Sequence, residues 1–207
     1  MGALLQNMNT FLHVGCVRNT KAQADYGFNT DDWQELHFDI NPHSEPDIIG
    51  TMTDMSAVED ESVDAIFSSH NIEHLYPYEV PLASRGFIRE LRPNGYSVIT
   101  CPDLQSVAKI VSQCRLTDPA YQSLAGPISG LDILYGYRTS LARGNLYMAH
   151  RCGFTQRSLA ETLMGHGFRP TVVRQRARYL DLWAITFNNA RQSEADMKRL
   201  TAVHFPI

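Results

Sequence analysis

The chain has 207 residues, enough for one sizeable hydrophobic core and too few for two ordinary domains. Hydrophobic residues make up 43% of the chain and charged residues 19%, which is an ordinary balance for a globular protein. The net charge of −4 argues against a nucleic-acid binder or a membrane-surface binder, because such proteins are normally basic.

The first half of the chain alternates short apolar runs with a helical pattern, which is typical of α/β layers. In chain order, we predict strands over residues 10–14, 35–40, 47–50, 63–69 and 95–101. Ahead of the last strand, apolar residues recur at helical spacing, and Pro93-Asn94-Gly95 ends that helix and turns into the strand. The polar segment 18–34 shows little amphipathic period, so it holds either a short first helix or a loop.

The second half contains one clear helix, for which Thr155 is the predicted N-cap. Two strands follow at 170–176 and 180–188, and a peripheral helix is expected from about residue 190. We therefore predict one domain over residues 1–207. Its fold class is α/β, with a doubly wound, mostly parallel sheet and a C-terminal antiparallel hairpin.

The connection over residues 103–153 is long and loop-like, and it is rich in Gly, Tyr and small residues. A segment of this kind above the strand ends is well placed to form a lid or a wall of a substrate site. The candidate residues within it are Tyr135, Tyr137, Arg138, Tyr147 and His150. The alternative interpretation is that the tyrosines cover the edge of the core and the arginine pairs with a surface acid.

Ligands of doubly wound sheets bind beyond the carboxyl ends of the strands, so residues at those ends carry the functional prediction. Gly15 follows the first strand, where a glycine allows a sharp turn and close approach of a ligand. Asp39 ends the second strand, and an acid at about this spacing can accept both hydroxyls of a ribose. Asp54 could reach an adenine amino group, and Met55 could pack on a flat ring. A plain turn, a helix cap and a core methionine are the alternatives.

Four segments in order resemble a class I S-adenosylmethionine-dependent methyltransferase of the small, Rossmann-like kind: "LHVGCVRN", "LHFDINP", "TDMSAVEDESVDAIFSSHNIEHL" and "FIRELRPNGYSVITCPD". They cover residues from about 10 to 103, and "CGFTQRSLAETLMGHGF" extends the resemblance to the late helix. The resemblance implies S-adenosylmethionine as the cofactor. The residues it places around the cofactor are Gly15, Cys16, Asp39, Ile40, Asp54, Met55, Ser69 and His70.

The glycine loop departs from the family pattern, which usually carries two or three glycines. Gly15 alone remains here, and Val17 and Asn19 stand where further glycines often occur. His13 lies near the place of an acid that is common within the first strand. Different groups are therefore expected to hold the amino-acid end of the cofactor.

Residues 70–74 read H-x-x-E-H, which on a helix is the signature of a zinc peptidase. Pro77 and Pro81 argue against a long regular helix through this segment. The methyltransferase resemblance explains Glu73 and His74 without a metal, because this family commonly has Glu-His between apolar residues after the fourth strand. We therefore predict no metal. A site assembled by folding from His70, His74 and His150 is the alternative, and the sequence alone does not support it.

Three residues are the candidates for catalysis: His70, His150 and Tyr135. His70 follows the strand that ends beside the methyl donor in this architecture, and a histidine there can accept a proton from a hydroxyl or an amine. A purely structural role for His70 is an equal alternative. For His74 we expect a hydrogen bond to the backbone that holds the loop.

The sequence thus predicts an S-adenosylmethionine-dependent methyltransferase that acts on a small molecule at oxygen or nitrogen. The alternative is a protein of the same fold that has no transfer activity and acts as a regulatory or assembly partner, an idea motivated by the reduced glycine loop. A nicotinamide-dependent enzyme is disfavoured because G-x-G-x-x-G is absent.

Four scattered cysteines without a C-x-x-C pair indicate reduced thiols and a cytoplasmic protein. The N-terminus does not resemble a signal peptide, and no apolar run approaches the roughly 20 residues that span a bilayer. The expected partner is a small-molecule substrate, with no nucleic acid and no membrane. A homodimer is left open.

Overall fold

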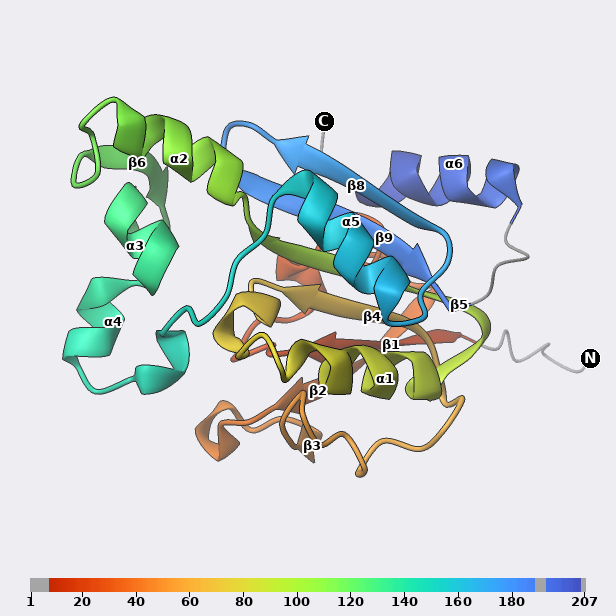
Figure 1. The fold of residues 1–207 in the computed structure, drawn as a ribbon. Coiled ribbons are helices and arrows are strands. Elements are labelled where there is room, and N and C mark those ends of the chain that lie inside the picture. The colour runs from red at the N-terminus through yellow and green to blue at the C-terminus, as the bar shows by residue number, and fades with distance from the viewer. Residues whose placement is uncertain (1–7, 189–192, 206–207) are drawn as a thin grey trace, which may run out of the picture.

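The computed structural model describes residues 8–188 and 193–205, and a seven-stranded sheet runs through them in the order β3-β2-β1-β4-β5-β9-β8 (Figure 1). The strands are β1 (Asn9–Val14), β2 (Trp33–Asp39), β3 (Ile48–Ile49), β4 (Val63–Ser69), β5 (Leu91–Pro102), β8 (Thr171–Arg176) and β9 (Asp181–Phe187). Neighbouring strands from β3 through β5 pair in parallel, and β9 runs antiparallel to both β5 and β8. The predicted fold class, with its C-terminal antiparallel hairpin, is confirmed.

Two helices cover one face of the sheet: α1 (Val80–Glu90) and α5 (Gln156–Gly165) (Figure 1). α1 buries Val80, Ala83 and Phe87 in the same hydrophobic cluster that receives Leu159 and Leu163 from α5. Every second residue of a strand faces these two helices, because successive side chains of a strand point to opposite faces of the sheet. This face therefore holds the larger part of the core.

The opposite face is covered by α6 (Glu194–His204) and by the segment that precedes β2. In the polar segment 18–34, residues 18–32 form a loop with one 3-10 turn, η1 (Lys21–Gln23), instead of a first helix, and the last two residues begin β2. Phe28 in this loop is fully buried and stacks on Phe11 of β1, with ring centroids 4.4 Å apart. An anchored aromatic ring thus replaces the amphipathic helix that the sequence lacks.

His204 attaches α6 to this loop through a buried hydrogen-bond chain. Its Nδ1 donates to Asp25 Oδ1 over 2.8 Å, because a carboxylate can only accept. Its Nε2 lies 2.7 Å from the hydroxyl of Tyr96 on β5. The C-terminal helix that the sequence indicates as peripheral is therefore fastened to the sheet.

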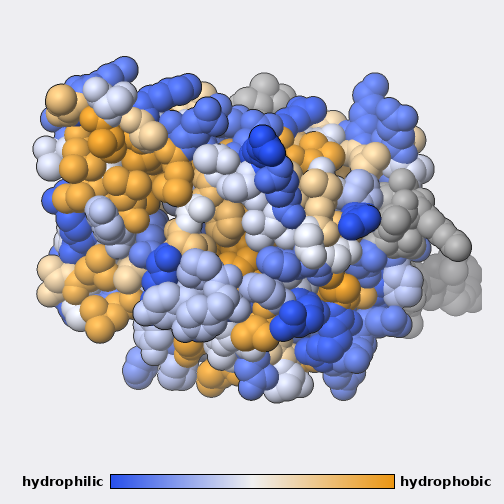
Figure 2. All heavy atoms as spheres, in the orientation of Figure 1, coloured by the Kyte–Doolittle hydropathy of each residue, from blue (hydrophilic) through white to orange (hydrophobic). Residues whose placement is uncertain are grey.

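The segment 103–153 is more regular than the expected loop. It contains α2 (Leu104–Ser112), β6 (Pro119–Ser123), β7 (Gly126–Ser129), α3 (Gly130–Tyr135) and α4 (Arg138–Ala142). Val107, Ile128 and Ile133 form a small core of its own. These elements lie beyond the carboxyl ends of the parallel strands (Figure 1), and apolar residues gather on their surface over α2 and α3 (Figure 2).

Short elements and local caps explain why the sequence pattern misses this regular structure. Asp103 accepts the amide of Gln105 at the start of α2, and Ser129 and Asp132 form a capping box at the start of α3. The strands β6 and β7 and the helices α3 and α4 are too short to show a clear hydrophobic period, whereas α2 has an amphipathic pattern that the sequence prediction missed. Within residues 8–188 and 193–205, no helix is both long enough and apolar enough to cross a membrane.

Glu90, the last residue of α1, is a buried carboxyl group whose protonation links the stability of the fold to pH. The residue is fully buried, and its Oε1 accepts a hydrogen bond from Arg89 over 3.1 Å. Burial raises the pKa of Glu90 from 4.5 to about 8, although Arg89 opposes the shift. Between these two pH values the unfolded chain loses the proton while the folded chain keeps it, so stability falls as the pH rises.

Glu90→Gln should remove this pH dependence. The variant should match the wild type near pH 5 and become the more stable protein towards pH 9, by roughly 1.4 kcal/mol for each unit of pKa shift. Urea unfolding at several pH values measures the difference. Glu59→Gln, at an exposed position, is the matched control. A constant difference between Glu90→Gln and wild type from pH 5 to 9 would show that Glu90 is ionised in the fold.

Candidate active site

The loop after β1 is held in shape by Asp39 at the end of β2. Asp39 is 5% exposed, and its Oδ2 accepts the amide of Val17 over 2.7 Å. Its Oδ1 accepts the amide of Asn41 over 2.8 Å. Gly15 adopts a φ of +65° and donates its amide to Phe38 over 2.8 Å. One carboxylate therefore orders two of the strand ends at which the sequence predicts a cofactor.

A glycine is required at position 15 because Asn71 packs directly over it. A Cβ on Gly15 would lie 2.2 Å from Asn71 Oδ1. The Asn71 amide donates to the carbonyl of Val14 over 2.8 Å, which fixes it there. An amide from the end of β4 thus closes the reduced glycine loop. Sequence reasoning missed Asn71, because nothing local to it indicates a contact with β1.

Cys16 follows Gly15 and is buried, whereas Ile40 follows Asp39 and is exposed. Cys16 is 1% exposed, and burial, with help from the Asp39 charge, raises its pKa to about 12. Its thiol is therefore not reactive at neutral pH. Ile40 is 44% exposed at the carboxyl end of β2, next to Asp39.

The two predicted adenine-side residues separate in the structure. Asp54 is exposed, and its Oδ1 accepts the amide of Ser56 over 3.1 Å. Met55 is 3% exposed and belongs to the main core, where it packs against Gly86 of α1. Its side chain is thus directed into the fold, which corrects the expectation that Met55 packs on a ligand ring.

The end of β4 is fastened to β5 and presents His70. Ser69 Oγ lies 2.9 Å from Thr100 Oγ1, and the amide of His70 donates to the Thr100 carbonyl over 3.0 Å. His70 has a φ of 54°, an uncommon conformation for a residue with a Cβ. Its ring lies between two carboxylates, with Nδ1 3.3 Å from Glu73 Oε1 and Nε2 3.5 Å from Asp181 Oδ2.

This position decides the charge of His70. Burial would lower its pKa, but the carboxylates of Asp181 and Glu73 overcome that effect and raise the pKa to about 9. The ring is therefore protonated at neutral pH and has no nitrogen free to accept a proton. This arrangement favours the structural alternative for His70, in which the residue bridges two buried acids.

A pocket of about 210 Å³ lies between the carboxyl ends of the central strands and the segment 103–153. His70 and His150 line it, together with the tyrosines Tyr121, Tyr137 and Tyr179. Tyr135 does not line it; its side chain is 62% exposed at the end of α3. The structure therefore brings two of the three catalytic candidates together and leaves Tyr135 outside.

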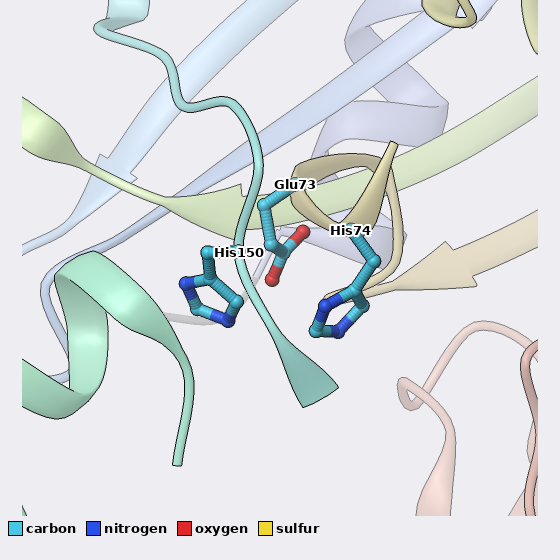
Figure 3. A group of neighbouring side chains, drawn as sticks. All are labelled: Glu73, His74 and His150. Atoms are coloured by element: carbon cyan, nitrogen blue, oxygen red, sulfur yellow. The ribbon is translucent and has the colours of Figure 1, made fainter. Parts of the chain in front are cut away.

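His74 and His150 lie beside Glu73 on the wall of this pocket (Figure 3). The His74 ring contacts the Ala149 carbonyl through Nδ1 over 3.1 Å, as expected for a residue that holds the loop. Burial lowers the pKa of His150, so this ring is neutral at pH 7. One ligand atom from each of Glu73, His74 and His150 lies within 4.8 Å of the others.

Solved structures that resemble the chain share its fold. A protein described as a possible exported protein from Bordetella parapertussis matches 88% of the chain with a TM-score of 0.56 and 16% identity, and the chain spans 62% of that protein. An S-adenosylmethionine-dependent methyltransferase from Archaeoglobus fulgidus matches 88% of the chain and 87% of its own length, with a TM-score of 0.54 and 14% identity. A possible histamine N-methyltransferase from Thermotoga maritima matches 87% of the chain and 83% of its own length, with a TM-score of 0.56 and 12% identity.

At the level of sequence, no curated protein matches the chain. Residues 12–99 match the family described as a methyltransferase domain, and this range contains Gly15, Asp39 and the end of β4. The family match covers less than half of the chain, and together with the order of the strands it shows that the fold is similar to that of class I S-adenosylmethionine-dependent methyltransferases.

Proposed function

We propose that the chain transfers a methyl group from S-adenosylmethionine to an oxygen or nitrogen atom of a small molecule held in the pocket between the strand ends and the segment 103–153. The pocket itself carries the proposal. Its volume of about 210 Å³ is below the roughly 300–1,000 Å³ of pockets for drug-sized ligands, which favours a small acceptor over a polymer.

The cofactor would lie across the ends of β1, β2 and β4. Each oxygen of Asp39 accepts one backbone hydrogen bond, and a carboxylate has about four acceptor positions, so two remain for the ribose hydroxyls. Ile40 offers an exposed apolar side chain next to Asp39 for the face of the adenine. Asp54, an exposed acceptor, would lie on the adenine side.

The methyl group would face the pocket from the end of β4, near Ser69 and His70. Methyl transfer is an in-line displacement from a sulfonium, which is already a good leaving group. The protein therefore has to align donor and acceptor and exclude water. Tyr121 and Tyr137 of the segment 103–153 line the pocket and would contribute to that exclusion.

Three further predictions accompany this function. The cytoplasmic location, the homodimer and the absence of nucleic-acid partners stay predictions from the sequence. The alternative function is a regulatory or assembly partner without transfer activity. Such a protein would bind S-adenosylmethionine as the proposed enzyme does, but it would transfer no methyl group.

Calorimetry with S-adenosylmethionine, S-adenosylhomocysteine and NAD tests the cofactor. The first two should bind at one site per chain and NAD should not bind. Release of S-adenosylhomocysteine should follow when a panel of small alcohols, phenols and amines is added. Failure of both sulfur compounds to bind would refute the proposal, and binding without turnover on any acceptor would favour the regulatory alternative.

Asp39→Asn tests the ribose contact while keeping the shape of the side chain. Hydrogen bonds to a charged group contribute about 1.5–3 kcal/mol, so affinity for S-adenosylhomocysteine should fall by roughly 10- to 150-fold. Asp118→Asn, an exposed change in the segment 103–153, should leave the affinity unchanged. Thermal unfolding would verify that both variants are folded. If the folded Asp39→Asn variant binds as tightly as the wild type, the ribose assignment is wrong.

A further inference from the structure

The side chains of Glu73, His74 and His150 converge on one point of the pocket wall (Figure 3). Glu73 and His74 belong to a 3-10 turn, η3 (Ile72–His74), that follows β4. His150 comes from the extended segment that leads to α5. Two grounds speak against a metal in the sequence: the absence of a long helix through residues 70–81, and the family resemblance, which explains Glu73 and His74 without an ion. The first ground concerns only a site on one helix. The three residues meet through the tertiary fold, so that argument does not apply to them.

The Glu73 carboxylate has one charged neighbour, His70, and accepts no hydrogen bond among the described residues. Glu73 is 1% exposed, and neither of its oxygens accepts a hydrogen bond from any residue that the structure describes. Its nearest polar contact is His70 Nδ1, 3.3 Å from Oε1. A buried carboxylate normally accepts several hydrogen bonds or binds a cation, because its desolvation is otherwise costly.

Each of the two histidines contacts a backbone carbonyl through Nδ1. Nδ1 of His74 lies 3.1 Å from the Ala149 carbonyl, and Nδ1 of His150 lies 2.8 Å from the Ile133 carbonyl. A carbonyl can only accept, so each Nδ1 carries the proton and each Nε2 keeps a free lone pair in the neutral ring. Ligating histidines characteristically donate their second nitrogen to a carbonyl in this manner.

We propose that Glu73, His74 and His150 bind one divalent first-row transition-metal ion, such as Zn²⁺. Two imidazole nitrogens and one carboxylate oxygen form a donor set that binds such ions in preference to Mg²⁺ or Ca²⁺, because Mg²⁺ and Ca²⁺ prefer all-oxygen sites. Three protein ligands leave at least one coordination position open. All three residues line the pocket, so that position faces the space proposed for the acceptor.

One consequence rests on the proposed methyl transfer. A metal ion held by these three residues would lower the pKa of an acceptor hydroxyl group at the open position; the hydroxyl proton would pass to solvent, and the oxygen would keep the electron pair. The oxygen then forms a C–O bond with the methyl carbon, the C–S bond of the donor breaks, and the sulfur keeps that pair in S-adenosylhomocysteine. The acceptor class is therefore an alcohol or a phenol.

Metal binding is measured without cofactor or acceptor. A protein that binds no metal would therefore refute the metal site without refuting the proposed methyl transfer. The metal-free protein is dialysed against Zn²⁺, Co²⁺ or Mg²⁺, and bound metal is determined by elemental analysis. We expect one equivalent of Zn²⁺ or Co²⁺ per chain, no retained Mg²⁺, and a raised unfolding temperature with Zn²⁺. A visible absorption band of the Co²⁺ protein would report nitrogen and oxygen ligation in the wild type itself.

The variants Glu73→Gln, His74→Asn and His150→Asn identify the ligands. Asparagine can still donate to the carbonyl that Nδ1 contacts, but it lacks Nε2. Each variant should lose at least the roughly 10- to 100-fold in affinity that removal of an outer-shell partner costs. His43→Asn, at an exposed position outside the cluster, should bind like the wild type.

Two outcomes would overturn the proposal. One is wild-type protein that retains less than stoichiometric Zn²⁺ and gives no Co²⁺ band, which would mean that His70 alone balances Glu73. The other is stoichiometric metal that survives unchanged in all three variants. If a variant does not fold, the Co²⁺ band of the wild type still decides between binding and no binding.

Discussion

The burial of Glu73 is the constraint on which the pocket depends. Its main-chain carbonyl accepts the amides of Arg151 over 2.8 Å and Cys152 over 3.2 Å, so the turn after β4 is bound to the end of the long insertion. Its carboxylate is inaccessible to solvent and lies among three histidines. The same residue thus fixes the backbone of the pocket wall and supplies its negative charge.

A row of alternating charges runs from this carboxylate to the antiparallel strands β9 and β8. Asp181 at the start of β9 is 1% exposed and accepts hydrogen bonds from Arg176 Nε over 3.0 Å and Arg176 Nη2 over 2.5 Å. His70 then bridges Asp181 and Glu73. Each buried acid has a cation next to it, which lowers the desolvation cost of both. The antiparallel hairpin, β8 with β9, is therefore electrostatically coupled to the end of β4.

The sequence predicts elements well where hydrophobic pattern and local caps agree. β4 has the predicted bounds, Val63–Ser69, because a continuous apolar run is typical of a central parallel strand. Thr155 caps α5 as predicted, since its hydroxyl accepts the amide of Ser158. The sequence does not decide between helix and loop for the segment 18–34, because its buried residues, among them Phe28 and Asp25, do not follow a helical period.

The positions of the candidate residues at the strand ends were predictable from the sequence, and the contacts between distant segments were not. Gly15, Asp39 and His70 lie at strand ends, as expected. Met55 and Tyr135 point elsewhere, because a residue's position along the chain does not fix the direction of its side chain. The roles of Asn71 and Glu73 arise from contacts with β1 and with residues 149–152, and a single sequence does not contain this information.

A crystal structure of the protein grown with S-adenosylhomocysteine and Zn²⁺, with anomalous data at the zinc edge, tests the account most directly. We predict one anomalous peak about 2.0–2.2 Å from an oxygen of Glu73 and from a nitrogen of each of His74 and His150. The ribose should contact Asp39, and the sulfur should face the same pocket. The account would be contradicted by a map with no peak at this cluster, or by a sulfur atom that lies outside the pocket.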